Sequence, residues 1–163
     1  MNNVETVYRK MIEYYRGDPH QIQHFVKVHS YSRLIGLSEG LDREMQITLE
    51  MAALVHDVGI KAGMEKYGRG NGKIQEELGP AIAEKMLTEL GVDKERVERI
   101  SYLVGHHHTY TGVEGQDYRI LLEADFLVNL HEEQTPMEEI RRAYDDIFRT
   151  ETGREICRTM FDF

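Results

Sequence analysis

The sequence predicts an all-α fold, a single-domain bundle of about six to eight helices. Apolar residues recur at helical spacing along most of the chain, and no segment requires a β-strand. Helix-start signals such as Asp18-Pro19 and Thr135-Pro136 precede these segments. A chain of 163 residues has the usual size of one domain with one sizeable core, so residues 1–163 are expected to form a single unit.

Three helices are predicted in the first third of the chain, at residues 3–16, 19–39 and 43–57. Gly17 and Gly40 follow the first two helices, where glycine is a common C-terminal stop. Asp42 is the expected N-cap of the third helix, which ends near Gly59. The third helix therefore carries the adjacent pair His56-Asp57 at its C-terminal end.

Residues 62–73 contain four glycines together with several charges, which predicts a mobile loop. Its position directly after His56-Asp57 would allow it to gate or shape a site, and a plain connector is the simpler alternative. Five further helices are expected at residues 74–90, 93–107, 117–133, 136–150 and 153–161. The last two would pack on, or extend, a motif-bearing core of about residues 20–130.

Composition and charge restrict the class of protein. With 40% hydrophobic and 30% charged residues, the chain resembles an ordinary globular domain. The net charge of −9 argues against broad nucleic-acid binding, although a metal and a few lysines can still attract a small phosphorylated molecule into one cleft. No apolar run approaches the roughly 20 residues that span a bilayer, and the N-terminus lacks a signal-peptide core. A single cysteine, Cys157, fits a reducing compartment, so a cytoplasmic location is expected.

His56-Asp57 is the first candidate for a metal site. Leu49, Ala52, Ala53 and His56 follow helical spacing, which places the imidazole on a core-facing stripe. An ionised carboxylate beside it, at the edge of a core, is costly unless a positive charge compensates it. A bound divalent cation would supply that charge, and imidazole with carboxylate suits Mn, Fe, Ni, Co or Zn.

His24 and Asp125 are predicted to point inward from two other helices. The apolar stripes that contain them are Val28, Tyr31 and Ile35 for His24, and Tyr118, Leu121, Leu122 and Val128 for Asp125. A buried carboxylate needs a cation or hydrogen bonds, and an ion pair with an arginine is the alternative for Asp125. His20 and His29 are interpreted as ordinary core or surface histidines.

The sequence His106-His107-His108 lies near the end of a predicted helix. Helical phase from Ile100, Leu103 and Val104 makes His107 the inward member, with His108 next, and a solvent-exposed cluster is the alternative. Lys27 lies one turn from His24, and Lys61 lies just after His56-Asp57, so both are candidates to contact a phosphate. Surface solvation is the simpler interpretation for either lysine alone.

The ordered motifs resemble the HD superfamily of metal-dependent phosphohydrolases. The matching segments are HFVKV (24–28), ALVHDVG (53–59), GPAIA (79–83), GHHHT (105–109) and EADFL (123–127). The resemblance implies an HD-type bundle in which His24, His56, Asp57 and Asp125 bind the metal. Relatives with two metals add a histidine upstream of Gly79, where this chain has QEEL (75–78), so one ion is favoured over two. Glu76 or Glu77 could stand in as an oxygen ligand in that stretch. The lysine that often follows the HD-x-G turn in the family is displaced by one residue here, to Lys61.

The expected activity is hydrolysis of a small phosphorylated substrate, with a nucleotide favoured. A metal can activate water and polarise a phosphoryl oxygen. Asp57 would orient the water or take its proton, while His107 or His108 would neutralise the phosphate or protonate the leaving oxygen. The alternatives are a catalytically idle regulatory module that binds a nucleotide, and oxidation at a di-iron centre. Oligomeric state is not predicted.

Overall fold

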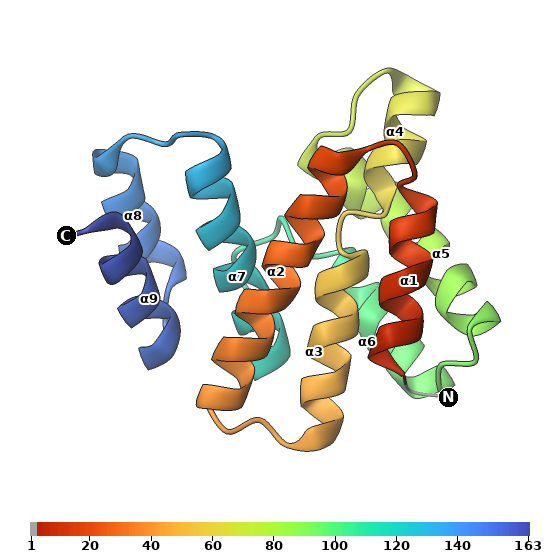
Figure 1. The fold of residues 1–163 in the computed structure, drawn as a ribbon, viewed down its shortest axis with the longest axis horizontal. Helices are drawn as coiled ribbons and strands as arrows, with labels where there is room; N and C mark the ends of the chain where they lie inside the picture. Colours follow the sequence, from red (N-terminus) through yellow and green to blue (C-terminus); the bar gives the residue numbers. More distant parts are fainter. Residues whose placement is uncertain (1–2) are drawn as a thin grey trace.

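The computed structural model describes residues 3–163, which form nine α-helices and no strand within that range. The helices are α1 (Val4–Tyr14), α2 (Pro19–Ser38), α3 (Arg43–Val55), α4 (Gly59–Tyr67), α5 (Gly72–Glu89), α6 (Lys94–Val104), α7 (Gln116–Glu132), α8 (Met137–Ile147) and α9 (Glu151–Phe161). Figure 1 shows α8 and α9 beside α7 at one end of the molecule and α1, α4 and α5 at the other. The predicted all-helical, single-domain bundle is confirmed.

Side-chain caps account for several helix starts. Asp18 and Asp42 accept hydrogen bonds from the backbone N–H groups of Gln21 and Met45, as their positions before α2 and α3 predicted. Pro19 occupies the first turn of α2, where its missing N–H leaves no helical bond unmade. The first helices are therefore specified locally by the sequence.

The prediction of a mobile loop at residues 62–73 is largely wrong. Residues 59–67 form α4, and α5 begins at Gly72, which leaves only a short link between the two helices. The glycine at position 63 serves close packing, because a Cβ there would lie 2.8 Å from both the carbonyl oxygen of Arg69 and Cγ2 of Ile74. Gly68 ends α4 with a φ of 72°, in the left-handed conformation that favours glycine. The glycines thus reflect a tight helical corner.

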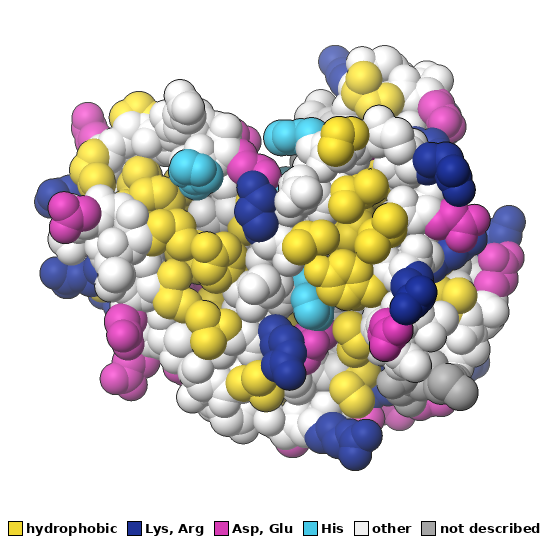
Figure 2. Space-filling view, in the orientation of Figure 1, with side chains coloured by type: hydrophobic (Ala, Val, Ile, Leu, Met, Phe, Trp, Pro, Cys, Tyr) yellow, Lys and Arg dark blue, Asp and Glu magenta, His cyan; other side chains and the backbone are white. Residues whose placement is uncertain are grey.

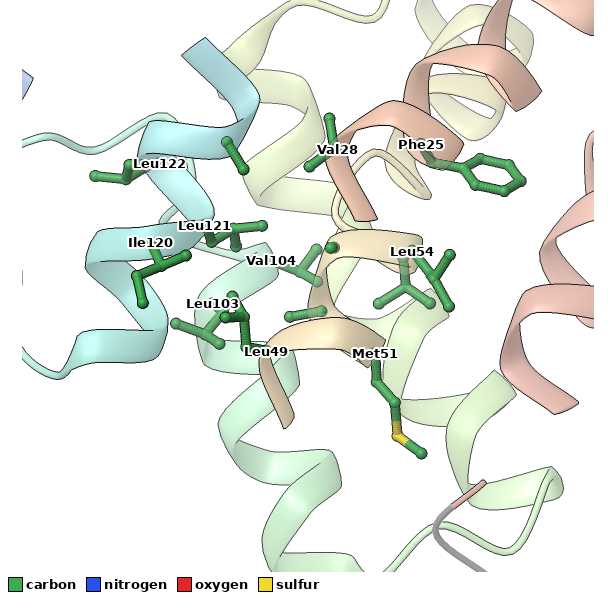
Figure 3. Close-up of a cluster of buried hydrophobic side chains, with 14 of the residues drawn as sticks. Phe25, Val28, Leu49, Met51, Leu54, Leu103, Val104, Ile120, Leu121 and Leu122 are labelled. Carbon is green, nitrogen blue, oxygen red and sulfur yellow. The ribbon is translucent and has the colours of Figure 1, made fainter. Parts of the chain in front are cut away.

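The core is built around α3, which contacts α1, α2, α6 and α7. Its side chains Leu49 and Leu54 are buried together with Val28 of α2, Leu103 of α6 and Leu121 of α7 (Figure 3). Burying such side chains is worth about 1.5–3 kcal/mol each. This packing fixes the C-terminal end of α3 in the middle of the bundle.

The C-terminal helices are attached to the bundle through a buried carboxylate on α7. Glu123 is fully buried and accepts hydrogen bonds from the backbone N–H groups of Arg149 and Thr150 and from the Thr150 hydroxyl. Burial raises the pKa of Glu123, although these donors favour its charged form. A Cβ at Gly153 in the first turn of α9 would overlap Glu123 Oε1. Glu123 therefore ties α9 to α7.

Within residues 3–163, none of the helices combines the length and the apolar character that crossing a membrane would require.

Candidate metal centre

Four polar side chains from three helical segments meet inside the bundle. His24 comes from the second turn of α2, His56 and Asp57 from the turn that follows α3, and Asp125 from α7. Each has a relative exposure of 8% or less, and His56 is fully buried. The apolar stripes that predicted inward positions for His24, His56 and Asp125 do bring these three side chains together, with Asp57 beside His56.

The four side chains converge on one small volume. Nε2 of His24 lies 3.3 Å from Nε2 of His56, 2.9 Å from Oδ2 of Asp57 and 3.3 Å from Oδ1 of Asp125. Nε2 of His56 lies 3.2 Å and 3.3 Å from the same two oxygens. Ligands held about 2.1 Å from a metal ion are separated by about 3.0–3.4 Å from one another in tetrahedral or octahedral geometry. These five distances therefore match those between neighbouring ligands of one ion. We call the four atoms the ligand quartet; within it, the ligand atoms of His24, His56 and Asp57 all lie within 4.8 Å of one another.

Hydrogen bonds on the outer ring nitrogens set the direction of both imidazoles. Nδ1 of His24 donates to Glu132 Oε1 at 2.8 Å, and Nδ1 of His56 donates to the carbonyl oxygen of Ala53 at 2.7 Å. A neutral ring that donates from Nδ1 presents a lone pair at Nε2. Oδ1 of Asp125 is buried and accepts no hydrogen bond from the described residues. When both rings are neutral, the facing atoms of the two imidazoles and of Asp125 are all acceptors, and the described donor to the group is the Gln21 amide, at 3.2 Å from Asp57 Oδ2. This excess of acceptors suits a cation site.

Electrostatics point in the same direction. Burial opposes a charged His24, but hydrogen bonds and the charges of Asp125 and Asp57 raise its pKa to about 11. Burial also opposes a charged His56, but Asp57 and Asp125 raise its pKa to about 10. Burial would raise the pKa values of Asp57 and Asp125, yet the nearby imidazoles lower both. The two buried carboxylates are therefore stabilised by a nearby positive charge, which protons on the imidazoles or a bound metal ion can supply.

A second group lies on the other side of Asp57. Nε2 of His107 is 3.4 Å from Asp57 Oδ1, and Nε2 atoms of both His107 and His108 lie close to Gln75 Oε1, at 3.0 and 2.9 Å. The Gln75 amide nitrogen donates to the carbonyl oxygen of Gly70 at 2.7 Å, which fixes the amide orientation. Asp57, His107 and His108 offer three ligand atoms within 4.8 Å of one another. The inward phase predicted for His107 agrees with its full burial.

Neither Glu76 nor Glu77, the predicted stand-ins for the histidine upstream of Gly79, faces the two imidazoles. Glu76 accepts hydrogen bonds from the backbone N–H of His108 and the hydroxyl of Thr109, and Glu77 is exposed. Gln75 occupies the position facing the two imidazoles. It belongs to a buried stripe with Gly79 and Ala83 on α5, a helical spacing that would have indicated its inward direction.

The HD domain family model matches residues 22–147 of this sequence. This chain belongs to the HD domain family. The HD-domain fold is also that of a predicted HD superfamily hydrolase from an uncultured Thermotogales bacterium, with a TM-score of 0.69 and 24% sequence identity. The match covers 98% of this chain and 85% of the other. No curated protein matches the sequence. Family membership and the His/Asp clusters together support a metal-dependent hydrolase as the general class.

The two lysines of this HD-domain protein have different surroundings. Lys27 Nζ lies 3.2 Å from Glu132 Oε2, beside the ligand quartet. Lys61 donates to the carbonyl oxygen of Tyr14 at 3.3 Å and lies over the Tyr14 ring, so it is held against α1. Of the two phosphate contacts predicted, only Lys27 is therefore placed next to the quartet.

Several site residues of the HD domain were missed from the sequence. Glu132 contacts His24, Gln21 Nε2 donates to Asp57 Oδ2 at 3.2 Å, and the Tyr15 hydroxyl donates to the Asp57 carbonyl oxygen at 2.7 Å. Glu132 follows Asp125 by seven residues, or two helical turns, which places both on one face of α7. His29, interpreted as an ordinary histidine, lies 3.0 Å from Glu50 and away from the quartet.

Proposed function

We propose that this HD-domain protein is a metal-dependent phosphohydrolase that acts on a small phosphorylated molecule, with a nucleotide as the favoured substrate. The ligand quartet is the observation that carries this proposal. Two imidazoles and two carboxylates suit Mn, Fe, Ni, Co or Zn, and one ion bound to His24, His56, Asp57 and Asp125 is favoured. When bound, such a cation polarises a phosphoryl oxygen and makes water a stronger nucleophile.

The side chains around the quartet supply the remaining roles. Asp57 uses Oδ2 in the quartet, and Oδ1 remains to orient the attacking water or accept its proton. His107 and His108 lie next to this oxygen, where an imidazole N–H can neutralise the phosphate or protonate the leaving oxygen. Figure 2 shows an indentation between the C-terminal end of α7 and the α4 side, with charged side chains and a histidine at its rim. A rim with both acidic and basic side chains favours a small anionic substrate over a long polyanion, which would need a continuous basic groove.

The overall charge supports a small substrate over a polymer. A net charge of −9 repels nucleic acid at long range, whereas a bound cation reverses the potential only within the site. We therefore propose a small phosphorylated molecule as partner, without broad nucleic-acid binding.

Metal analysis followed by a phosphate-release screen tests the proposal. The purified protein is expected to contain divalent metal and to release phosphate from at least one nucleotide or sugar phosphate. Asp57→Ala should abolish both metal content and hydrolysis, because it removes a quartet oxygen and the proton acceptor together. Glu84→Ala, an exposed change on α5, serves as the control and should alter neither.

Two results would reject this function. One is an Asp57→Ala variant with full hydrolytic activity. The other is a metal-replete wild-type protein that binds nucleotides without turning any over, which would favour an idle regulatory module.

A further inference from the structure

The carboxylate of Glu132 lies at the C-terminal end of α7 and is directed into the protein. Its side chain is only 12% exposed, and its two oxygens have different partners. Oε1 accepts from Nδ1 of His24 at 2.8 Å, and Oε2 accepts from Nζ of Lys27 at 3.2 Å. The same carboxylate therefore contacts a proposed metal ligand on one side and a half-exposed lysine on the other.

We propose that Glu132 is a positioning residue that sets the affinity of the metal centre by fixing the tautomer and ring direction of His24. When a metal ion replaces the proton on Nε2, the proton that Glu132 holds on Nδ1 would keep the Nε2 lone pair directed toward the side of Asp57 and Asp125. A carboxylate behind a ligating imidazole also makes that imidazole a stronger donor. This inference rests on the proposed metal site.

The two histidines of the quartet depend on different kinds of support. His56 donates to the backbone carbonyl of Ala53, three residues earlier in its own helix, so its orientation follows from α3 itself. His24 has no comparable backbone partner in the described structure, and its Nδ1 meets only the side chain of Glu132. We therefore expect metal affinity to depend on the side chain at position 132. No side-chain substitution would remove the backbone partner of His56 in the same way.

Lys27 gains a role from the same geometry. Because it bonds to Glu132 Oε2, it holds the carboxylate in place and balances its charge. This contact assigns Lys27 first to the support of His24 rather than to a phosphate of the substrate. Loss of Lys27 should then weaken metal binding even when no substrate is present.

Zn²⁺ affinity, measured by competition with a chromophoric chelator at neutral pH, tests the inference without any activity measurement. Glu132→Leu keeps a similar size but offers no acceptor, and the Zn²⁺ Kd should rise about 10- to 100-fold. Glu132→Gln retains an oxygen acceptor, and its Kd should rise by less than about tenfold. Glu133→Leu, at the exposed neighbouring position, is the matched control and should leave the Kd unchanged. In the Zn²⁺-loaded proteins, NMR of the His24 ring nitrogens should show a single Nδ1–H tautomer in the wild type and the loss of that tautomer in Glu132→Leu.

The outcomes separate this inference from the proposed function. Wild-type Zn²⁺ binding with an unchanged Kd in Glu132→Leu would overturn the role of Glu132 alone. Absence of Zn²⁺ binding by the wild type would overturn the proposed function and this inference with it. If Glu132→Leu does not fold, Lys27→Met decides: a Kd raised about threefold or more supports the inference, and a wild-type Kd overturns it.

Discussion

The side-chain oxygen of Gln75 lies 3.0 Å from Nε2 of His107 and also contacts His108. A single neutral amide thus spans two imidazoles next to Asp57. Since its nitrogen is committed to the Gly70 carbonyl, the amide cannot flip without losing that bond. The second cluster therefore has an amide oxygen, rather than a further imidazole, beside His107 and His108.

Replacing Gln75 with leucine should leave metal binding intact but reduce catalysis. With one ion in the ligand quartet, the variant is expected to retain about one metal per chain by elemental analysis. Its kcat/KM for phosphate release should fall about tenfold, because His107 and His108 lose their shared partner. Two ions in the wild type and one in Gln75→Leu would contradict the single-ion arrangement.

Metal removal should destabilise the protein. The quartet holds two buried carboxylates and two inward lone pairs, which a cation stabilises in the folded state only. At a free metal concentration of about 1,000 times Kd, binding adds about 4 kcal/mol, or a Tm increase of about 10 °C for a domain of this size. Thermal unfolding with and without chelator measures this shift. Asp57→Ala, which cannot complete the quartet, should show the same Tm under both conditions.

Glu50 should make stability depend on pH. Its burial opposes ionisation, but hydrogen bonds from His29 and Gln46 lower the pKa of the carboxyl group below its ordinary value. Its stabilising effect is therefore complete above the unfolded glutamate pKa of about 4.3 and is lost as the pH falls through the lower folded pKa. Denaturant unfolding of metal-free Glu50→Gln should show a loss of about 1–2 kcal/mol at pH 7.

The same difference between wild type and Glu50→Gln should shrink once the pH falls below about 4. Glu13→Gln, an exposed substitution on α1, should give no such pH-dependent difference. A gap that stays constant from pH 7 to pH 3 would show that the charge of Glu50 is not responsible.

Gly153→Ala should destabilise the protein although it lies within a helix. Helix propensity alone predicts a gain of about 1 kcal/mol from this change. The new Cβ, however, would overlap the Glu123 carboxylate, so the free energy of unfolding should fall by about 1–3 kcal/mol. Glu155→Ala on the exposed face of α9 should change stability by less than about 0.5 kcal/mol. An increase in stability for Gly153→Ala would be incompatible with this packing.

Helical periodicity predicted most of the fold because the helices are amphipathic and locally capped. The same periodicity placed His24, His56 and Asp125 on inward faces, since each interrupts an apolar stripe. It failed at residues 62–73, where glycine was interpreted as flexible. In the structure Gly63 allows close approach of the Arg69 backbone, and the partner that makes glycine necessary is not visible from spacing alone.

The supporting residues were harder to predict than the ligands. Glu132 and Gln21 are polar residues on partly polar helices, and nothing in their own neighbourhood distinguishes them from solvated side chains. Their roles depend on contacts across more than 30 residues, such as Gln21 with Asp57 and Glu132 with His24. A local pattern contains no information about such pairings, although the two-turn spacing of Asp125 and Glu132 offered a hint.

Glu123 and Asp125 are two residues apart on α7 and serve opposite sides of it. Asp125 faces the quartet, whereas Glu123 binds the amides that begin α9. Proteolytic nicking between α8 and α9 would strip a buried negative charge of its donors, at a cost of about 1–3 kcal/mol or more. Because Asp125 lies two residues away on the same helix, we expect this loss to loosen the segment of α7 that carries one member of the quartet.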